Sequence, residues 1–218
     1  FDHLSKTLAH FNQFLIFTHT KKSPMSTFGQ FMSKYAPITK DEVSLINQHL
    51  EEVNLKKNQV LKEAGQPSQG VYFLAQGAMR SFFMNDGKSV TWKFYFPGDL
   101  PTDYFSFLHQ EPSKLNFVAL TNSKVQYLPK ASIAKLIKKV QKGKELDLFF
   151  SRFAYLDVRN RAEQLLLLNP EQRYEDLVNR NPELVLELPA QHIATYLGIQ
   201  PPSYSRLKRR YFAKKKKK

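Results

Sequence analysis

The strongest constraint on the fold is a basic C-terminal segment, residues 188–218, which holds nine Lys and Arg and no Asp or Glu. Within it, Ile193 and Leu197 are spaced as on one face of a short helix, and Gly198 supplies a turn that a residue with a Cβ resists. Pro201-Pro202 suit the first turn of a second helix, where a missing N–H costs little. The segment therefore predicts a helix-turn-helix.

The second helix of this motif has an apolar and a polar side. Tyr204 and Leu207 are expected to face inward, which leaves a polar and basic surface of the kind that enters a DNA major groove. The candidate DNA-binding residues on this surface and at its rim are Gln191, Ser203, Ser205, Arg206, Lys208 and Arg209. A buried ion pair is the alternative role for Arg206.

The charge of the chain is concentrated at this end. The chain holds 33 Lys and Arg against 19 Asp and Glu, and without the nine C-terminal cations 24 remain. Such asymmetry suits a polyanion, because each neutralised phosphate releases counterions. The run Lys214–Lys218 is either a solvated tail or a set of phosphate contacts. The chain has no Cys, which excludes disulfides, thiolate nucleophiles and cysteine-ligated metals and is compatible with a reducing cytoplasm.

The N-terminal stretch differs from the rest of the chain. Residues 1–24 are expected to be an extension ahead of the domain, with an amphipathic helix as the alternative. The apolar run Phe11–Phe17 is too short to span a bilayer, so no membrane partner is expected.

The middle of the chain reads as strands. Four β-prone runs are separated by Gly and Asp-Gly turn signals, and they are Val71–Leu74, Met79–Met84, Val90–Phe96 and Val125–Leu128. In the third run, Val90, Trp92, Phe94 and Phe96 alternate with polar residues and are expected to share a buried face. Several short strands at regular spacing favour a β-roll or jelly roll.

A long helix is expected at residues 144–168, which contain no Gly or Pro. Phe149, Phe153, Leu156 and Leu167 lie on one line of this helix. The line is interpreted as a dimerisation surface, because it is more apolar than a two-domain monomer requires. A core helix packed within one chain is the alternative.

The order of β-roll, long helix and helix-turn-helix resembles the Crp/Fnr family of bacterial transcription regulators. The resemblance rests on Gly65-Gln66-Pro67, Gly77, Pro97-Gly98-Asp99, Phe153 to Val158, Arg161 to Leu166, Tyr196-Leu197-Gly198 and Ser205-Arg206-Leu207. It implies an α+β fold with a cyclic-nucleotide-binding-like roll at residues 25–143, a dimerisation helix at 144–168 and a winged helix-turn-helix at 169–218. It further implies a homodimer that binds a two-fold symmetric double-stranded DNA site, with RNA polymerase as an expected partner.

The resemblance places a ligand near Gly98, Asp99, Asp103, Lys114 and Asn116, between the roll and the long helix. The cyclic-nucleotide-binding members hold the phosphate with an Arg, but residues 112–117 contain none, and Lys114 lacks the bidentate guanidinium. No response to cyclic AMP is therefore expected, and neither the existence nor the identity of another effector follows from the sequence.

The recognition helix also departs from the family. Pro201-Pro202 stand where the family has an Arg-Glu pair, so Arg206 is the remaining base reader, while Gln191 and Ser203 match phosphate-contacting positions. This departure keeps an alternative open, a small-molecule-binding roll with a degenerate, non-specific helix-turn-helix. No enzyme is expected, because the six His residues lack metal-ligand spacing and no phosphate-binding Gly loop or nucleophile elbow is present.

Overall fold

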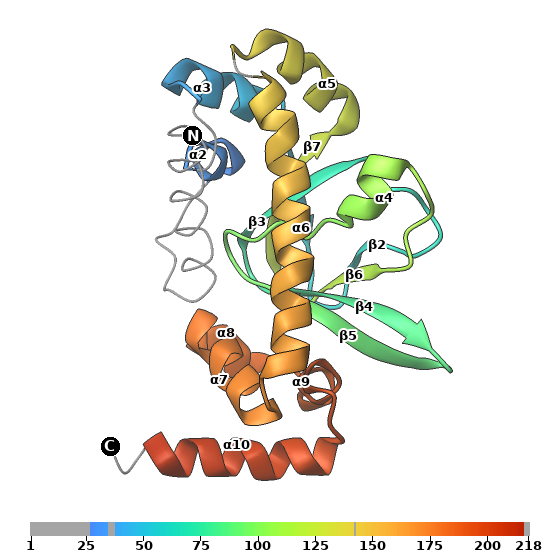
Figure 1. Ribbon diagram of the computed structural model, residues 1–218, viewed down its shortest axis with the longest axis vertical. Helices are drawn as coiled ribbons and strands as arrows, with labels where there is room; N and C mark the ends of the chain where they lie inside the picture. The colour runs from blue at the N-terminus through green and yellow to red at the C-terminus, as the bar shows by residue number, and fades with distance from the viewer. Residues whose placement is uncertain (1–26, 35–37, 142, 216–218) are drawn as a thin grey trace.

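The computed structural model describes residues 27–34, 38–141 and 143–215. Within these ranges a β-roll occupies the N-terminal half, one long helix passes beside it, and short helices form the C-terminal end (Figure 1). The α+β class predicted from the sequence is confirmed. The predicted extension at residues 1–24 lies outside the described residues.

The roll consists of two antiparallel sheets. One has the strand order β1-β7-β3 and the other β2-β6-β4-β5. The strands are β1 Glu51–Leu55, β2 Val60–Lys62, β3 Gly70–Gln76, β4 Met79–Asn85, β5 Lys88–Tyr95, β6 Asn116–Ala119 and β7 Ser123–Pro129. The four predicted runs are β3, β4, β5 and β7. The sequence did not reveal β1, β2 and β6, because each is too short to show an alternating pattern.

Helices cover the roll and build the C-terminal end. Their bounds are α2 Phe28–Ser33, α3 Lys40–Gln48, α4 Tyr104–His109, α5 Lys130–Lys139, α6 Gly143–Leu167, α7 Pro170–Arg180, α8 Pro182–Glu187, α9 Ala190–Leu197 and α10 Pro201–Lys215. Thr39 and Asn169 form capping boxes at the starts of α3 and α7, which satisfies backbone N–H groups that the helices leave unpaired. The wing implied by the resemblance is absent from the described residues, because the chain beyond Leu207 continues as α10.

The burial pattern of β5 differs from the predicted alternation. Val90 is 38% exposed, whereas its neighbour Thr91 is buried. The cause is a register shift opposite β4, where Ser81 pairs with Lys93 but Phe82 pairs with Thr91. An irregularity of this kind re-aims the side chains beyond it. It turns Thr91 toward α9, where its backbone N–H donates to Thr195 Oγ1 (3.2 Å).

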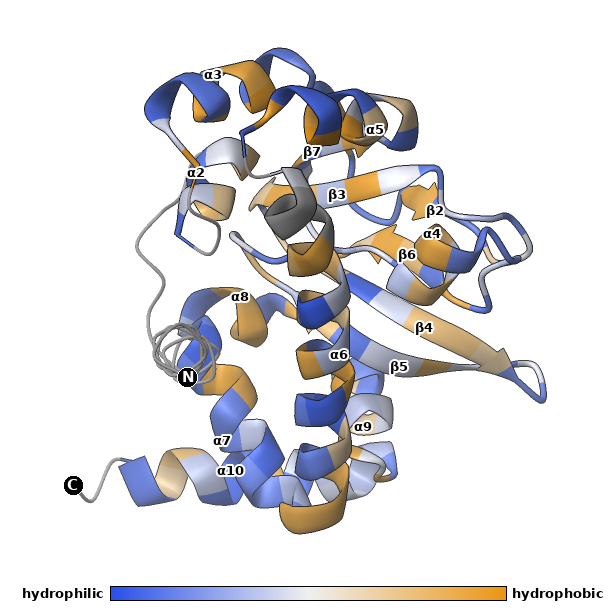
Figure 2. Cartoon of the chain, turned by 45° about the horizontal axis from the view of Figure 1, so that its top comes forward, coloured by the Kyte–Doolittle hydropathy of each residue, from blue (hydrophilic) through white to orange (hydrophobic). Residues whose placement is uncertain are grey.

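One face of α6 belongs to the core of the protomer. Phe149 and Phe150 on this face pack with Phe28 and Phe31 of α2 and with Phe73 of β3. Figure 2 shows apolar and polar turns alternating along α6, with α2 and the roll at its sides.

This packing corrects the predicted dimerisation line. Phe149 and Leu156 are 7% and 4% exposed, and Phe153 is half-buried against Phe31 and Tyr104. Phe149 and Phe153 serve the interior of one chain, because Phe31 of α2 packs against both and Tyr104 of α4 packs against Phe153. Leu167, in contrast, is 75% exposed.

Candidate nucleic-acid interface and roll pocket

The predicted helix-turn-helix is formed by α9 and α10. Gly198 joins them with a φ of 68°, a left-handed conformation that glycine adopts without strain. Tyr204 and Leu207 are buried as expected, in one cluster with Ile193 and Leu197 of α9. The packing of this apolar face against α9 therefore fixes the direction in which the outer side of α10 points.

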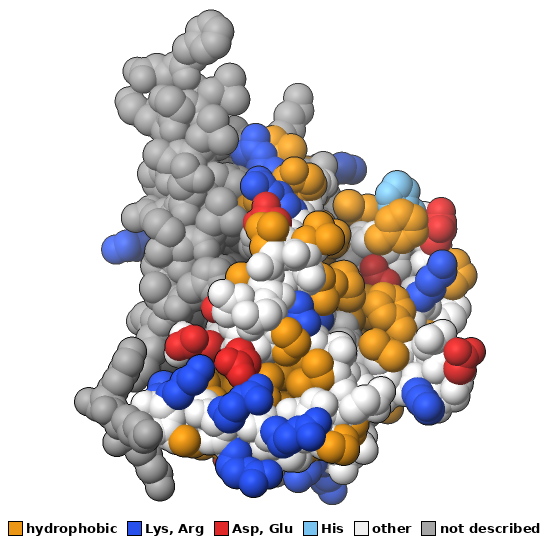
Figure 3. All heavy atoms as spheres, turned by 60° about the horizontal axis from the view of Figure 1, so that its bottom comes forward, with side chains coloured by type: hydrophobic (Ala, Val, Ile, Leu, Met, Phe, Trp, Pro, Cys, Tyr) orange, Lys and Arg blue, Asp and Glu red, His pale blue; other side chains and the backbone are white. Residues whose placement is uncertain are grey.

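All candidate DNA-binding residues except Gln191 lie on α10. Ser205, Arg206 and Arg209 are exposed, Ser203 and Lys208 are half-buried, and Gln191 is exposed on α9. Arg206 Nη2 donates to Ser203 Oγ (3.3 Å), which holds the guanidinium over the first turns of α10. Figure 3 shows Lys and Arg side chains gathered across the face that α10 forms.

The cations of α10 differ in their partners. Arg210 forms a salt bridge with Glu171 of α7 (2.6 Å), and Lys214 lies 3.5 Å from the same carboxylate. Among the described residues neither Arg206 nor Arg209 forms a salt bridge, so the alternative of a buried ion pair for Arg206 does not hold. These two guanidinium groups are available to an external anion.

Two buried arginines that the sequence analysis did not single out as site residues hold the C-terminal end of α9. Arg161 of α6 donates to the carbonyl of Tyr196 (2.8 Å), and Arg173 of α7 donates to that of Leu197 (2.7 Å). Cations stabilise the C-terminal end of a helix, where carbonyl groups lack intrahelical partners. Burial lowers the pKa of Arg161 from its ordinary value. The turn before α10 is thus anchored from two helices at once.

The roll also contacts the C-terminal helices directly. Phe94 of β5 packs against Tyr196 with ring centroids 5.2 Å apart, and Thr195 Oγ1 donates to Thr91 Oγ1 (3.0 Å). Arg180 of α7 forms a salt bridge with Asp99 (2.6 Å). Burial lowers the pKa of Arg180, but the Asp99 carboxylate opposes this, and the pKa is raised above its ordinary value. Asp99 therefore links the roll to α7.

The other predicted ligand residues differ in their surroundings. Asp103 caps α4 by accepting from Ser106 N (3.2 Å), and its other oxygen accepts from the Ser113 hydroxyl (2.7 Å). Asn116 accepts from Ala64 N (3.0 Å), whereas Lys114 is exposed. Gly98 lies in the turn after β5 with a φ of 88°.

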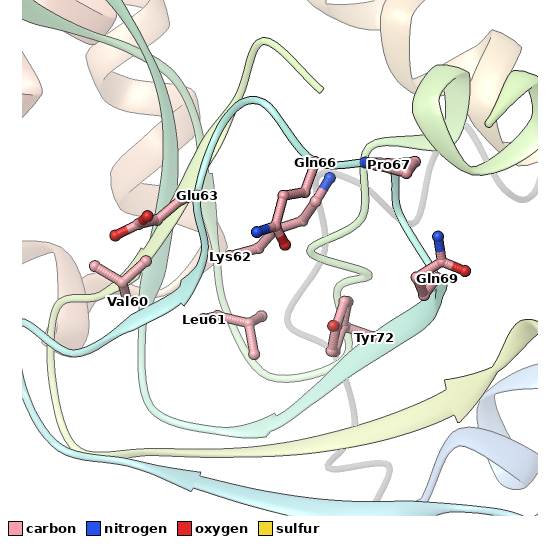
Figure 4. Close-up of a pocket in the computed structure, with 8 residues that line it drawn as sticks. All are labelled: Val60, Leu61, Lys62, Glu63, Gln66, Pro67, Gln69 and Tyr72. Atoms are coloured by element: carbon pink, nitrogen blue, oxygen red, sulfur yellow. The ribbon is translucent and has the colours of Figure 1, made fainter. Parts of the chain in front are cut away.

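The roll has a pocket elsewhere, a cavity of about 330 Å³ that none of the five predicted ligand residues lines. This roll pocket is lined by residues of β2, the loop after β2 and β3, namely Val60, Leu61, Lys62, Glu63, Gln66, Pro67, Gln69 and Tyr72 (Figure 4). Lys62 Nζ donates to Ser68 Oγ (2.7 Å). Burial lowers the pKa of Lys62, and the nearby Asp103 charge opposes this. Lys62 carries no sequence signal of its own beyond its place just before the turn at Gly65.

The described residues contain no group of three or more His, Asp or Glu side chains placed to hold a metal ion. No helix among them combines the length and apolar character that crossing a membrane requires.

Residues 52–140 match the family described as the cyclic nucleotide-binding domain. The FixK2 structure from Bradyrhizobium japonicum has a TM-score of 0.58 at 21% identity, covering 76% of this chain and 85% of that chain. The chain has the fold of the Crp/Fnr regulators. The catabolite activator protein of Thermus thermophilus shares this Crp/Fnr fold with a TM-score of 0.52 at 17% identity, over 81% of this chain and 84% of its own.

A regulator from Eubacterium rectale assigned to the Crp/Fnr family has a TM-score of 0.58 at 16% identity, covering 82% of this chain and 85% of that chain. No curated protein sequence is significantly similar to this chain. The resemblance inferred from the sequence is confirmed at the level of the roll domain and of the fold.

Proposed function

We propose that the chain is a dimeric, sequence-specific DNA-binding transcription regulator of the Crp/Fnr type. The observation that carries this proposal is the outer face of α10, where Arg206 and Arg209 are exposed and form no salt bridge among the described residues. Arg206 projects from a helix whose inner face and preceding turn are both fixed. A guanidinium placed in this way can bind the O6 and N7 of guanine.

The dimer is proposed to form through the exposed face of α6. Leu148, Tyr155, Val158, Ala162 and Leu165 recur on this helix at steps of seven, three, four and three residues, and all are exposed. Such spacing gives two parallel helices an apolar seam that is continuous from Tyr155 to Leu165. Leu167 lies exposed at the far end of the same helix. A two-fold axis along this seam would present two copies of α10 to a symmetric operator.

The regulator is proposed to act without cyclic AMP. Asp99, which the resemblance places near the ligand, is held by Arg180. Residues 112–117 supply no Arg for a phosphate, and Asp103 adds a negative charge nearby. DNA affinity should therefore be the same with and without cyclic AMP. With DNA as its partner, the protein would act in the cytoplasm, alongside RNA polymerase.

A second candidate function is a small-molecule-binding roll whose helix-turn-helix binds polyanions without specificity. Pro201 and Pro202 favour it, because both are exposed at the start of α10 and neither side chain can hydrogen-bond a base edge. Under this function Arg206 would contact phosphate alone.

Selection from random duplex DNA separates the two functions. The proposed regulator should enrich a two-fold symmetric motif. Arg206→Ala should weaken binding to that motif by about 1–3 kcal/mol and relax the preference at one base pair per half-site. Equal losses on the selected motif and on random DNA would favour the second function.

Arg210→Ala is the matched control for Arg206→Ala. It removes a guanidinium from the same helix that is already paired with Glu171. It should weaken binding to all DNA sequences equally, and by less than Arg206→Ala weakens binding to the selected motif. The reason is that a contact to the DNA phosphate backbone carries no sequence information.

A further inference from the structure

The roll pocket is lined by residues from both sheets of the roll. Lys62 comes from the last position of β2 in one sheet, and Tyr72 comes from β3 in the other. The loop between them contributes Gln66 and Gln69. The cavity of about 330 Å³ falls at the small end of the range for ligand sites in proteins.

Lys62 is a half-buried cation held in a fixed position. Its ammonium donates to the Ser68 hydroxyl, and Ser68 is 1% exposed. Ser68 is held in turn, because its N–H donates to Ser106 Oγ (2.9 Å) and its carbonyl accepts from Gln110 Nε2 (3.1 Å). An ammonium has three N–H donors, so Lys62 retains donors for a further acceptor.

The nearby carboxylates do not neutralise Lys62 directly. Lys62 forms no salt bridge among the described residues. Both oxygens of Asp103 accept hydrogen bonds from Ser106 and Ser113. The carboxylate of Glu63 lies on the opposite side of the pocket from the ammonium (Figure 4). A partly desolvated cation in this setting favours an anionic partner.

The remaining walls are apolar and amide groups. Tyr72 stacks on Tyr127 with ring centroids 4.7 Å apart and an interplanar angle of 25°, which fixes the orientation of its ring. Leu61 lies beside Tyr72 in the pocket, and the amide of Gln66 lies beside Lys62 (Figure 4). The pocket thus offers a flat apolar wall and, next to it, one cation with hydrogen-bonding amides.

We propose that the roll pocket binds a small organic carboxylate that carries a flat apolar ring, with the carboxylate on Lys62 and the ring against Leu61 and Tyr72. One ammonium balances the single charge of a carboxylate. A phosphate dianion would need further fixed donors, and its second charge would be repelled by the nearby Asp103. Binding at this pocket is independent of the C-terminal helices, whereas a role as the effector of transcription rests on the proposed function.

Calorimetric titration of the full chain with phenylacetate tests this proposal. Phenylacetamide, which has the same shape without the charge, should bind at least about tenfold more weakly, and so should phenyl phosphate. This comparison uses the wild-type protein and therefore does not depend on the folding of a variant. Equal affinity for the acid and the amide, tighter binding of phenyl phosphate, or no binding of phenylacetate at millimolar concentration would overturn the proposal.

Lys62→Gln should weaken phenylacetate binding by at least about tenfold. The matched control is Lys57→Gln, which removes an exposed lysine between β1 and β2 and should leave the affinity unchanged. If Lys62→Gln bound phenylacetate with unchanged affinity, the carboxylate would be bound by another group, and the inference would be wrong.

DNA binding without ligand distinguishes this inference from the proposed function. Lys62→Gln should bind the selected operator as the wild type does, because Lys62 is remote in the fold from α10. If the wild-type protein did not bind DNA, the proposed function would be overturned, but the phenylacetate titration could still be interpreted. Failure of the titration alone would leave the DNA-binding proposal standing.

Discussion

The two faces of α6 carry similar side chains and meet different surroundings. On one face Phe150 is 1% exposed and Phe149 is 7% exposed. On the other, Tyr155 is 65% exposed and Val158 is 56% exposed. The difference lies in what the rest of the chain supplies, because α2, β3 and α4 cover the first face and no described element buries the second.

This difference separates two kinds of stabilisation. The covered face contributes to the folding of one chain through removal of apolar area from water. The uncovered face can contribute only when another surface meets it, and a contiguous exposed apolar stripe is typical of an interaction site. Substitutions on the two faces should therefore change different measurements.

The largest effect is expected for Phe150→Ala on the covered face. Phe150 contacts Phe28, Tyr104, Phe107 and Phe149. Its removal leaves a cavity that these rings cannot fill completely, which should lower the free energy of unfolding by about 3–5 kcal/mol. Denaturant unfolding measures this loss at a fixed protein concentration.

The control for Phe150→Ala is Phe105→Ala, which removes a ring that is 60% exposed on α4 and should change stability by less than about 1 kcal/mol. If the two substitutions cost the same, the packing around Phe150 would not be the source of its effect. The fraction of Phe150→Ala that remains folded should keep the oligomeric state of the wild type.

The contrast between the faces also marks what the sequence could predict. The helix-turn-helix followed from local signals, because the turn at Gly198 and the prolines at the start of α10 act on their immediate neighbours. The apolar line of α6 was recognised, but its role was not. Its cover comes from Phe28 and Phe31, more than a hundred residues earlier in the chain, and helical periodicity carries no information on which element packs against which face.

The partners of the predicted ligand residues were hidden from the sequence for a similar reason. Asp99 was placed at a pocket by resemblance, but Arg180 lies 81 positions away in sequence and meets it only in the folded chain. Lys62 showed no pattern of its own, since its position depends on Ser68 and on the pairing of β2 with β6. Long-range pairing of this kind is not encoded in the spacing of residues along one element.

The second effect in size is expected on the uncovered face. Val158→Glu places a carboxylate in the proposed apolar seam, where each chain would meet the same charge on its partner. Self-association should weaken by on the order of 3 kcal/mol, with little change in the unfolding of the single chain. Sedimentation at micromolar concentration should show the wild type as a dimer and Val158→Glu as a monomer.

The matched control is Val90→Glu, the same substitution at an exposed valine of β5 that lies outside α6. It should remain dimeric. A monomeric wild type, or a dimer that survives Val158→Glu, would remove the uncovered face of α6 from the interface.

The smallest effect is expected on the side of α6 that faces the roll, between the two extremes. Asp157 forms a salt bridge with Lys93 of β5, and the side chains are 28% and 15% exposed. Asp157→Asn keeps the shape and removes the charge, which should lower the free energy of unfolding by about 1 kcal/mol, since a hydrogen bond to a neutral group replaces one to a charged group.

Glu163→Gln is the comparison for Asp157→Asn, because it neutralises an acid of the same helix whose salt bridge with Arg159 lies on the surface. Surface pairs contribute little once solvent screens them, so this substitution should leave the denaturation midpoint unchanged. Raising the salt concentration should lessen the effect of Asp157→Asn only slightly, since a partly buried pair is less screened than an exposed one. If salt abolished the effect of Asp157→Asn, the pair would behave as a surface pair, and the roll would not shield this side of α6.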